Sequence, residues 1–93
     1  MTKADQRSER YKTGAATHWS KRERSMVTIA LLAALGQHDE CAMHVRAAKN
    51  TGASREDICE AMLHVAIYAG VPAANTAIKI IKKIFEEEDT AKS

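Results

Sequence analysis

Aromatic residues and long apolar segments are scarce in this chain of 93 residues. Aromatic side chains make up 4% of the residues, so a core has to be built from Ala, Ile, Leu, Val and Met, which favours packed helices. No apolar run approaches the ~18 residues that a membrane-spanning helix needs. Nowhere do four or more residues alternate cleanly between apolar and polar types, as a half-buried strand requires. These absences predict an all-α protein without a membrane partner.

The chain has only two cysteines, Cys41 and Cys59, and no CxxC motif. This excludes a disulfide framework and a cysteine-rich zinc site, and two isolated thiols indicate a reducing, cytoplasmic location. We expect both to be buried as small apolar side chains. The first residues are basic but lack the apolar region of a secretory signal.

Length and charge further restrict the kinds of protein that this chain can be. Ninety-three residues fit one domain, which buries only about 60–65% of its unfolded surface, so self-association is the expected source of further stability. The net charge is +2, and residues 1–24 carry seven Lys or Arg against three Asp or Glu. No recognition motif accompanies this basic excess, so a nucleic-acid partner is not expected.

Composition divides the chain into three parts. Residues 1–19 are polar and show no sustained periodicity, which predicts a flexible basic arm. Residues 20–88 hold the periodic apolar segments and are predicted to form the helical domain. Residues 89–93 are expected to fray.

Start and stop signals predict four helices. Ser20 with Glu23 and Ser54 with Asp57 have the spacing of capping boxes, and Pro72 suits the first turn of a helix. The predicted ranges are 20–35, 39–50, 54–69 and 72–87, with glycines after three of them. The first helix is apolar on most sides and should be nearly enclosed. In the fourth, the residues expected to face inward are Ala74, Ala77, Ile78, Ile81, Ile84 and Phe85.

The connections between these helices are very short, so successive helices are expected to pack as antiparallel hairpins. The predicted fold is therefore a small antiparallel helical bundle.

Two Glu–His pairs are the main candidates for chemistry. Glu40 and His44, and likewise Glu60 and His64, are four residues apart and share a helix face; Tyr68 extends the second stripe by one turn. A histidine exchanges protons near neutral pH, and a glutamate can fix its orientation. From spacing alone, a solvent-exposed pair is the commonest explanation, acid–base work is second, and metal binding is third because bundle metal sites use Glu-x-x-His.

Anion-binding candidates lie in other segments. Arg22, Arg24 and Arg46 could hold a carboxylate, although charged side chains are usually solvated. Asn75 follows the turn formed by Gly70 and Pro72, so it is placed beside a helix N-terminus, which attracts anions. A tight turn with small residues at a packing contact explains that segment equally well.

The stretches "KRERSMVTIALLAALG" (21–36) and "ECAMHVRAAKNTGASREDICEAMLHVAIYAGVPAANTAIKI" (40–80) resemble the carboxymuconolactone decarboxylase family, within the alkylhydroperoxidase D-like superfamily. The resemblance covers roughly residues 20–87. It implies an all-α fold that assembles into rings, commonly trimers or hexamers. It also implies decarboxylation of 4-carboxymuconolactone to 3-oxoadipate enol-lactone in aromatic-acid catabolism, with no metal or organic cofactor.

Under this resemblance His44, oriented by Glu40, is the expected proton donor. His64 and Tyr68 come next as a second donor or oxyanion partner, and Arg22, Arg24 and Asn75 would bind the small anionic substrate.

A sister branch uses CxxC followed by His for peroxide chemistry. Here the two cysteine positions hold Gln37 and Glu40, which disfavours dithiol activity. The remaining alternatives are a non-catalytic helical oligomerisation module and a redox relative that lacks the CxxC.

Overall fold

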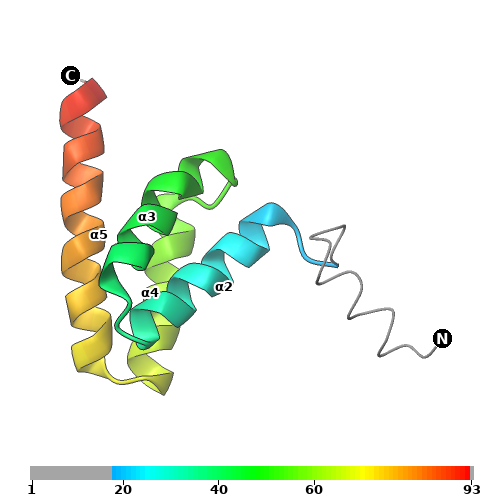
Figure 1. The fold of residues 1–93 in the computed structure, drawn as a ribbon, viewed down its shortest axis with the longest axis vertical. Helices are drawn as coiled ribbons and strands as arrows, with labels where there is room; N and C mark the ends of the chain where they lie inside the picture. Colours follow the sequence, from blue (N-terminus) through cyan, green and yellow to red (C-terminus); the bar gives the residue numbers. More distant parts are fainter. Residues whose placement is uncertain (1–17, 93) are drawn as a thin grey trace.

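A computed structural model describes residues 18–92, and its regular structure is entirely helical in this range (Figure 1). The elements are α2 (Lys21–Ala34), α3 (His38–Ala47), the 3₁₀ turn η1 (Ala48–Asn50), α4 (Arg55–Tyr68) and α5 (Val71–Lys92). The predicted all-α class is confirmed. Residues 1–17 of the predicted basic arm lie outside the described residues.

The starts of α2 and α4 are fixed by local hydrogen bonds, as predicted. Ser20 Oγ accepts from the Glu23 N–H at 3.1 Å, and the Glu23 carboxylate accepts from the Ser20 N–H at 2.8 Å. Ser54 and Asp57 repeat this arrangement, with both distances at 3.0 Å. Each capping box satisfies backbone donors that the helix itself leaves unpaired.

Two of the predicted helix ends depend on glycine conformation. Gly36 has φ 73° and Gly70 has φ 105°, values in the left-handed region that other residues rarely adopt. These glycines stop the helices and let the chain turn sharply. The ends of α2 and α4 can therefore be predicted from the sequence.

The C-terminal end of the bundle differs from the prediction. Helix α5 continues to Lys92, through the residues expected to fray. Arg55 on α4 binds Asp89 at 2.8 Å and lies 4.5 Å from the centre of the Phe85 ring, so contacts with α4 support the last turns. Helix α3 is shorter than predicted, because Ala48–Asn50 tighten into the 3₁₀ turn.

The order of the helices around the bundle corrects the hairpin prediction. Helix α2 packs against α3 and α4, and α5 also packs against α3 and α4. Successive helices therefore pair at α2–α3 and α4–α5, whereas α3 and α4 make little direct contact. The segment between them therefore carries the chain across the diagonal of the bundle, and Ala48 and Ala53 of this segment are buried in the core.

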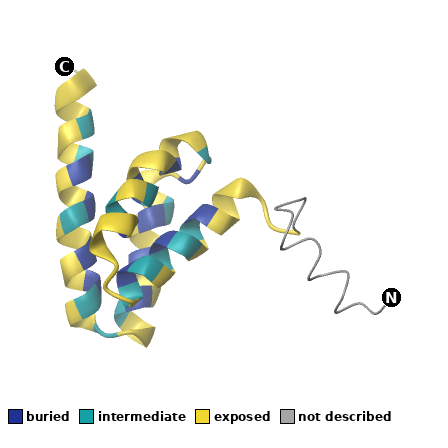
Figure 2. Ribbon diagram, in the orientation of Figure 1, coloured by how far each residue is buried: buried dark blue, intermediate teal, exposed yellow. Residues whose placement is uncertain are grey.

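The core is built mainly from small and branched aliphatic residues, with the buried faces turned toward the bundle centre (Figure 2). Its members are Ile29, Ala33, Cys41, Val45, Ala48, Ala53, Ile58, Ala61, Met62, Val65, Ala74, Ala77, Ile81 and Ile84. The expected enclosure of α2 is wrong, since Leu31 is 56% exposed and Val27 38%. Ile78 is also exposed, because only one face of α5 meets the other helices.

None of the helices between residues 18 and 92 combines the length and the apolar composition that crossing a bilayer requires.

Candidate functional site

Five of the seven predicted site residues are divided between two hollows that lie on different faces of α2. One hollow, of about 240 Å³, includes His44; the other, of about 600 Å³, includes His64. Their linings share no residue. Within a single chain, the two histidines therefore do not face a common hollow.

The His44 hollow lies where the first half of α2 meets the end of α3. It is lined by Lys21, Arg24, Ser25, Thr28, His44, Ala47 and Thr51. Cys41 and Val45 on α3 point into the core, which holds this helix against its neighbours and leaves His44 partly buried at the edge. The hollow thus places one imidazole beside two cations and three hydroxyl groups.

The positive charge of this hollow lies at an unfavourable place for a helix. Lys21 and Arg24 belong to the first turn of α2, where the helix dipole is positive and acidic side chains are preferred. Glu23 is the one acidic residue of that turn, and it is engaged in the capping box. An anion bound in the hollow would offset this local excess of positive charge.

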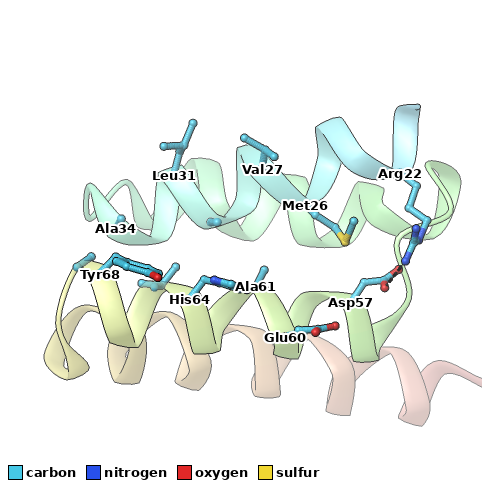
Figure 3. A pocket seen from close by; sticks show the side chains of 13 residues that line it. Arg22, Met26, Val27, Leu31, Ala34, Asp57, Glu60, Ala61, His64 and Tyr68 are labelled. Carbon is cyan, nitrogen blue, oxygen red and sulfur yellow. Dashed lines mark hydrogen bonds and ion pairs between the residues drawn. The ribbon is translucent and has the colours of Figure 1, made fainter. Parts of the chain in front are cut away.

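The second hollow runs between α2 and α4 and is mostly apolar (Figure 3). His64 and Tyr68 lie along α4 with their rings stacked, 6.2 Å apart and 10° from parallel. Glu60 lines the same hollow, so the Glu60–His64–Tyr68 stripe predicted from sequence is one continuous surface. Tyr68 is nevertheless 82% exposed, so its hydroxyl is not sheltered from water.

Arg22 closes one end of this second hollow by binding Asp57. Figure 3 shows it reaching from α2 to α4, and Nε and Nη2 donate to the two carboxylate oxygens of Asp57 at 2.8 and 2.7 Å. These bonds, with the Ser54 N–H, hold the pKa of the Asp57 carboxyl well below its usual range. Because Arg22 already holds a carboxylate, it is poorly placed to bind a substrate carboxylate.

Two other predicted site residues lie away from both hollows. Glu40 is exposed and, within residues 18–92, makes no hydrogen bond or ion pair with His44. The predicted orientation of His44 by Glu40 is therefore not observed in the single chain. Asn75 is exposed on α5 and lines neither hollow.

The sequence prediction missed Lys21, Ser25, Thr28 and Thr51 as neighbours of His44. A signal was available for three of them: positions 21, 25 and 28 lie on one face of α2, together with Arg24. Thr51 follows the 3₁₀ turn, and sequence periodicity gives no indication of where such a residue points.

The two cysteines differ from each other, although both were predicted to be buried. Cys41 is buried, and burial raises the pKa of its thiol, which disfavours the reactive thiolate. Cys59 is exposed, which contradicts the prediction, because α4 turns this position outward between the buried Ile58 and Met62. The structure gives neither thiol a partner for dithiol chemistry.

Between residues 18 and 92, no three His, Cys, Asp or Glu side chains come together as a metal-binding group.

Comparison with known proteins supplies an independent indication of the family. The model of the carboxymuconolactone decarboxylase family matches residues 4–83. A 4-carboxymuconolactone decarboxylase of Acinetobacter baylyi is 45% identical over 64 residues, covering 69% of this chain and 48% of the relative. The nitrosuccinic acid decarboxylase npaB of Metarhizium robertsii is 31% identical over 67 residues, covering 72% and 47%. The chain thus spans about half the length of these curated relatives.

Proposed function

Because the chain belongs to the carboxymuconolactone decarboxylase family, we propose that it removes CO₂ from a small anionic lactone without a cofactor. The proposed substrate is 4-carboxymuconolactone, and the product is 3-oxoadipate enol-lactone, a step in aromatic-acid catabolism. The observation that carries the proposal is the placement of His44 in one hollow with Lys21 and Arg24. Two cysteines without a disulfide favour a cytoplasmic location.

The reaction requires a proton donor and a binding site for an anion. The bond between the ring and the leaving carboxylate breaks, CO₂ departs, and the electron pair spreads through the unsaturated lactone to its carbonyl oxygen. His44, as the imidazolium, then gives a proton to the ring carbon and regains one from water. A partly buried imidazole at the edge of a hollow can both reach the substrate and exchange protons with solvent.

The two cations have a separate role in this scheme. A cation that paired with the leaving carboxylate would stabilise the ground state and slow its loss, so binding energy is better applied to the carboxylate that the product retains. Arg24 and Lys21 supply that contact, and Arg24 offers two donors in one plane. Arg24 is free for this role, whereas Arg22 is bound to Asp57.

The second hollow favours self-association. Val27, Leu31 and Tyr68 are large apolar side chains that remain exposed along it, and Leu63 and Ile67 extend the apolar surface of α4. Large apolar side chains that lie together on an exposed surface are typical of an interaction site. We propose that copies of the chain cover this surface in a homo-oligomer, a trimer or a hexamer.

The test is CO₂ release from 4-carboxymuconolactone by the 93-residue chain and by Arg24→Gln. We expect turnover by the unaltered chain, and for Arg24→Gln a KM raised about tenfold with a smaller change in kcat. Lys79→Gln, on the exposed face of α5, is the matched control and should behave like the unaltered chain.

Absence of CO₂ release by the unaltered chain would overturn the proposed activity and favour a non-catalytic oligomerisation module. Unchanged kinetics in Arg24→Gln would instead place the substrate outside the His44 hollow.

A further inference from the structure

Ser25 is the one polar residue buried in the described part of the chain. It is 8% exposed, yet it belongs to the lining of the His44 hollow. Its neighbours along the same face of α2 are Lys21 and Thr28. A largely buried serine therefore lines the hollow in which we place the reaction.

Among the residues that the structure describes, the Ser25 hydroxyl has no hydrogen-bond partner. Between residues 18 and 92, every side-chain nitrogen or oxygen that is fully enclosed has a hydrogen-bond partner, whereas the Ser25 oxygen has none. It follows that its oxygen is not sealed in the core. With nine-tenths of the residue covered, the opening left to this oxygen is the hollow itself.

Neither helix formation nor packing accounts for serine at this position. A hydroxyl within a helix can bond back to the carbonyl four residues earlier, and Thr76 does so to Pro72 at 3.1 Å. Ser25 makes no such bond to Lys21. Alanine forms helices better than serine and would leave no unpaired polar group at this largely covered position. An unpaired donor that is retained in a hollow indicates a ligand that pairs with it.

We propose that the Ser25 hydroxyl donates a hydrogen bond to the lactone carbonyl oxygen of the substrate. This inference rests on the proposed function. As CO₂ leaves, the electron pair of the broken bond reaches this oxygen, and the hydrogen bond strengthens as negative charge develops there. When His44 protonates the ring carbon, the pair returns to form the new carbon–hydrogen bond and the carbonyl is restored. A donor held in place before the reaction lowers the energy of the charged intermediate.

Steady-state kinetics of Ser25→Ala test this role. We expect kcat to fall about 100-fold, with KM raised by no more than about fivefold, because the contact is strongest in the charged intermediate. The melting temperature should be equal to or above that of the unaltered chain, since alanine suits the helix. Thr76→Ala, which removes a hydroxyl far along the chain on α5, is the matched control and should keep its kcat.

A structural role for Ser25 would give the opposite pattern, a lower melting temperature with unchanged kcat, and would overturn the inference.

A binding experiment with muconolactone tests the Ser25 hydrogen bond independently of the proposed decarboxylation. Muconolactone has the same ring, carbonyl and retained carboxylate, but no carboxyl group to lose. We expect calorimetry to give about fivefold weaker binding to Ser25→Ala than to the unaltered chain. The unaltered chain could release no CO₂ and still bind muconolactone more tightly than Ser25→Ala does. That result would overturn the proposed decarboxylation and support the Ser25 hydrogen bond. Equal binding by the two proteins, or no binding by either, overturns the Ser25 contact.

Discussion

Two histidines with the same local sequence signature have different surroundings. His44 and His64 each follow a glutamate by four positions, so this spacing alone does not rank them. In the fold His44 lies with cations and hydroxyl groups, whereas His64 lies against Tyr68 in an apolar hollow. Helical spacing determines which residues of one helix share a face. It does not determine which neighbouring helix covers that face.

The same limit applies to Arg22 and Cys59. Arg22 was a substrate-binding candidate because of its charge, but it binds Asp57, which is 35 positions away in sequence. Cys59 was expected to be buried because cysteine usually is, but its helix presents it to solvent. Residue type predicts a tendency, and the packing of the helices decides each case.

The Arg22–Asp57 ion pair predicts a pH-dependent loss of stability. The pKa of Asp57 is lowered in the folded chain, so the pair contributes stability above the pKa of the unfolded carboxyl, about 4, and loses it as the pH falls further toward the folded value. Asp57→Asn should therefore lower the melting temperature at pH 7. The difference from the unaltered chain should narrow at pH 3.

Circular dichroism melts at both pH values check this prediction. Asp39→Asn serves as the control, because Asp39 is exposed in the first turn of α3 and makes no ion pair in the described structure. A difference that stays constant between pH 7 and pH 3 would show that the ion pair does not stabilise the fold.

Among the elements, helix starts and stops were predictable where they depend on adjacent residues. The capping boxes at Ser20 and Ser54 and the left-handed Gly36 and Gly70 each act within a few positions. The end of α5 was not predictable in this way. Its last turns are held by Arg55, a residue of another helix, so a local pattern of charged residues incorrectly indicated fraying.

Helix α5 should therefore lose order at its end when Arg55 is replaced. In Arg55→Gln, the bonds to Asp89 and the stacking on Phe85 are weakened, and we expect faster amide exchange in residues 86–92. Exchange in the centre of α5, around Ile81, should change little.

Hydrogen-exchange mass spectrometry of the two proteins provides the measurement, with Lys83→Gln on the exposed face of α5 as the control. Equal protection of the last turns in all three proteins would mean that Arg55 does not hold them.

For the whole molecule, the helical class was predictable and the arrangement of the helices was only partly so. Short connections correctly paired α2 with α3 and α4 with α5, but they gave no indication that α3 and α4 lie across the bundle diagonal. They also could not reveal that α2 is covered on one side only. Its exposed face carries Val27 and Leu31, which is apolar surface that one chain leaves open (Figure 3).

This open surface predicts an assembly that one charged substitution disrupts. We expect light scattering after size exclusion to give a multiple of the 10.2 kDa chain mass. Leu31→Asp should give the mass of a single chain, because burying a charged aspartate in an apolar interface carries a large desolvation penalty. The fold of each chain should persist, since Leu31 is 56% exposed.

Lys79→Asp, on the outer face of α5, is the control and should keep the assembly. A single-chain mass for the unaltered protein, or an unchanged mass for Leu31→Asp, would contradict self-association through this surface.

The central claim is that the reaction takes place at His44 and not at His64. The most direct measurement compares CO₂ release from 4-carboxymuconolactone by His44→Gln and His64→Gln, with far-UV circular dichroism to confirm that both fold. General acid catalysis contributes about 10²- to 10⁴-fold, so we predict a kcat loss of that size in His44→Gln and a kcat within about threefold of the unaltered chain in His64→Gln. Full activity in His44→Gln, or a comparable loss in His64→Gln, would contradict this assignment.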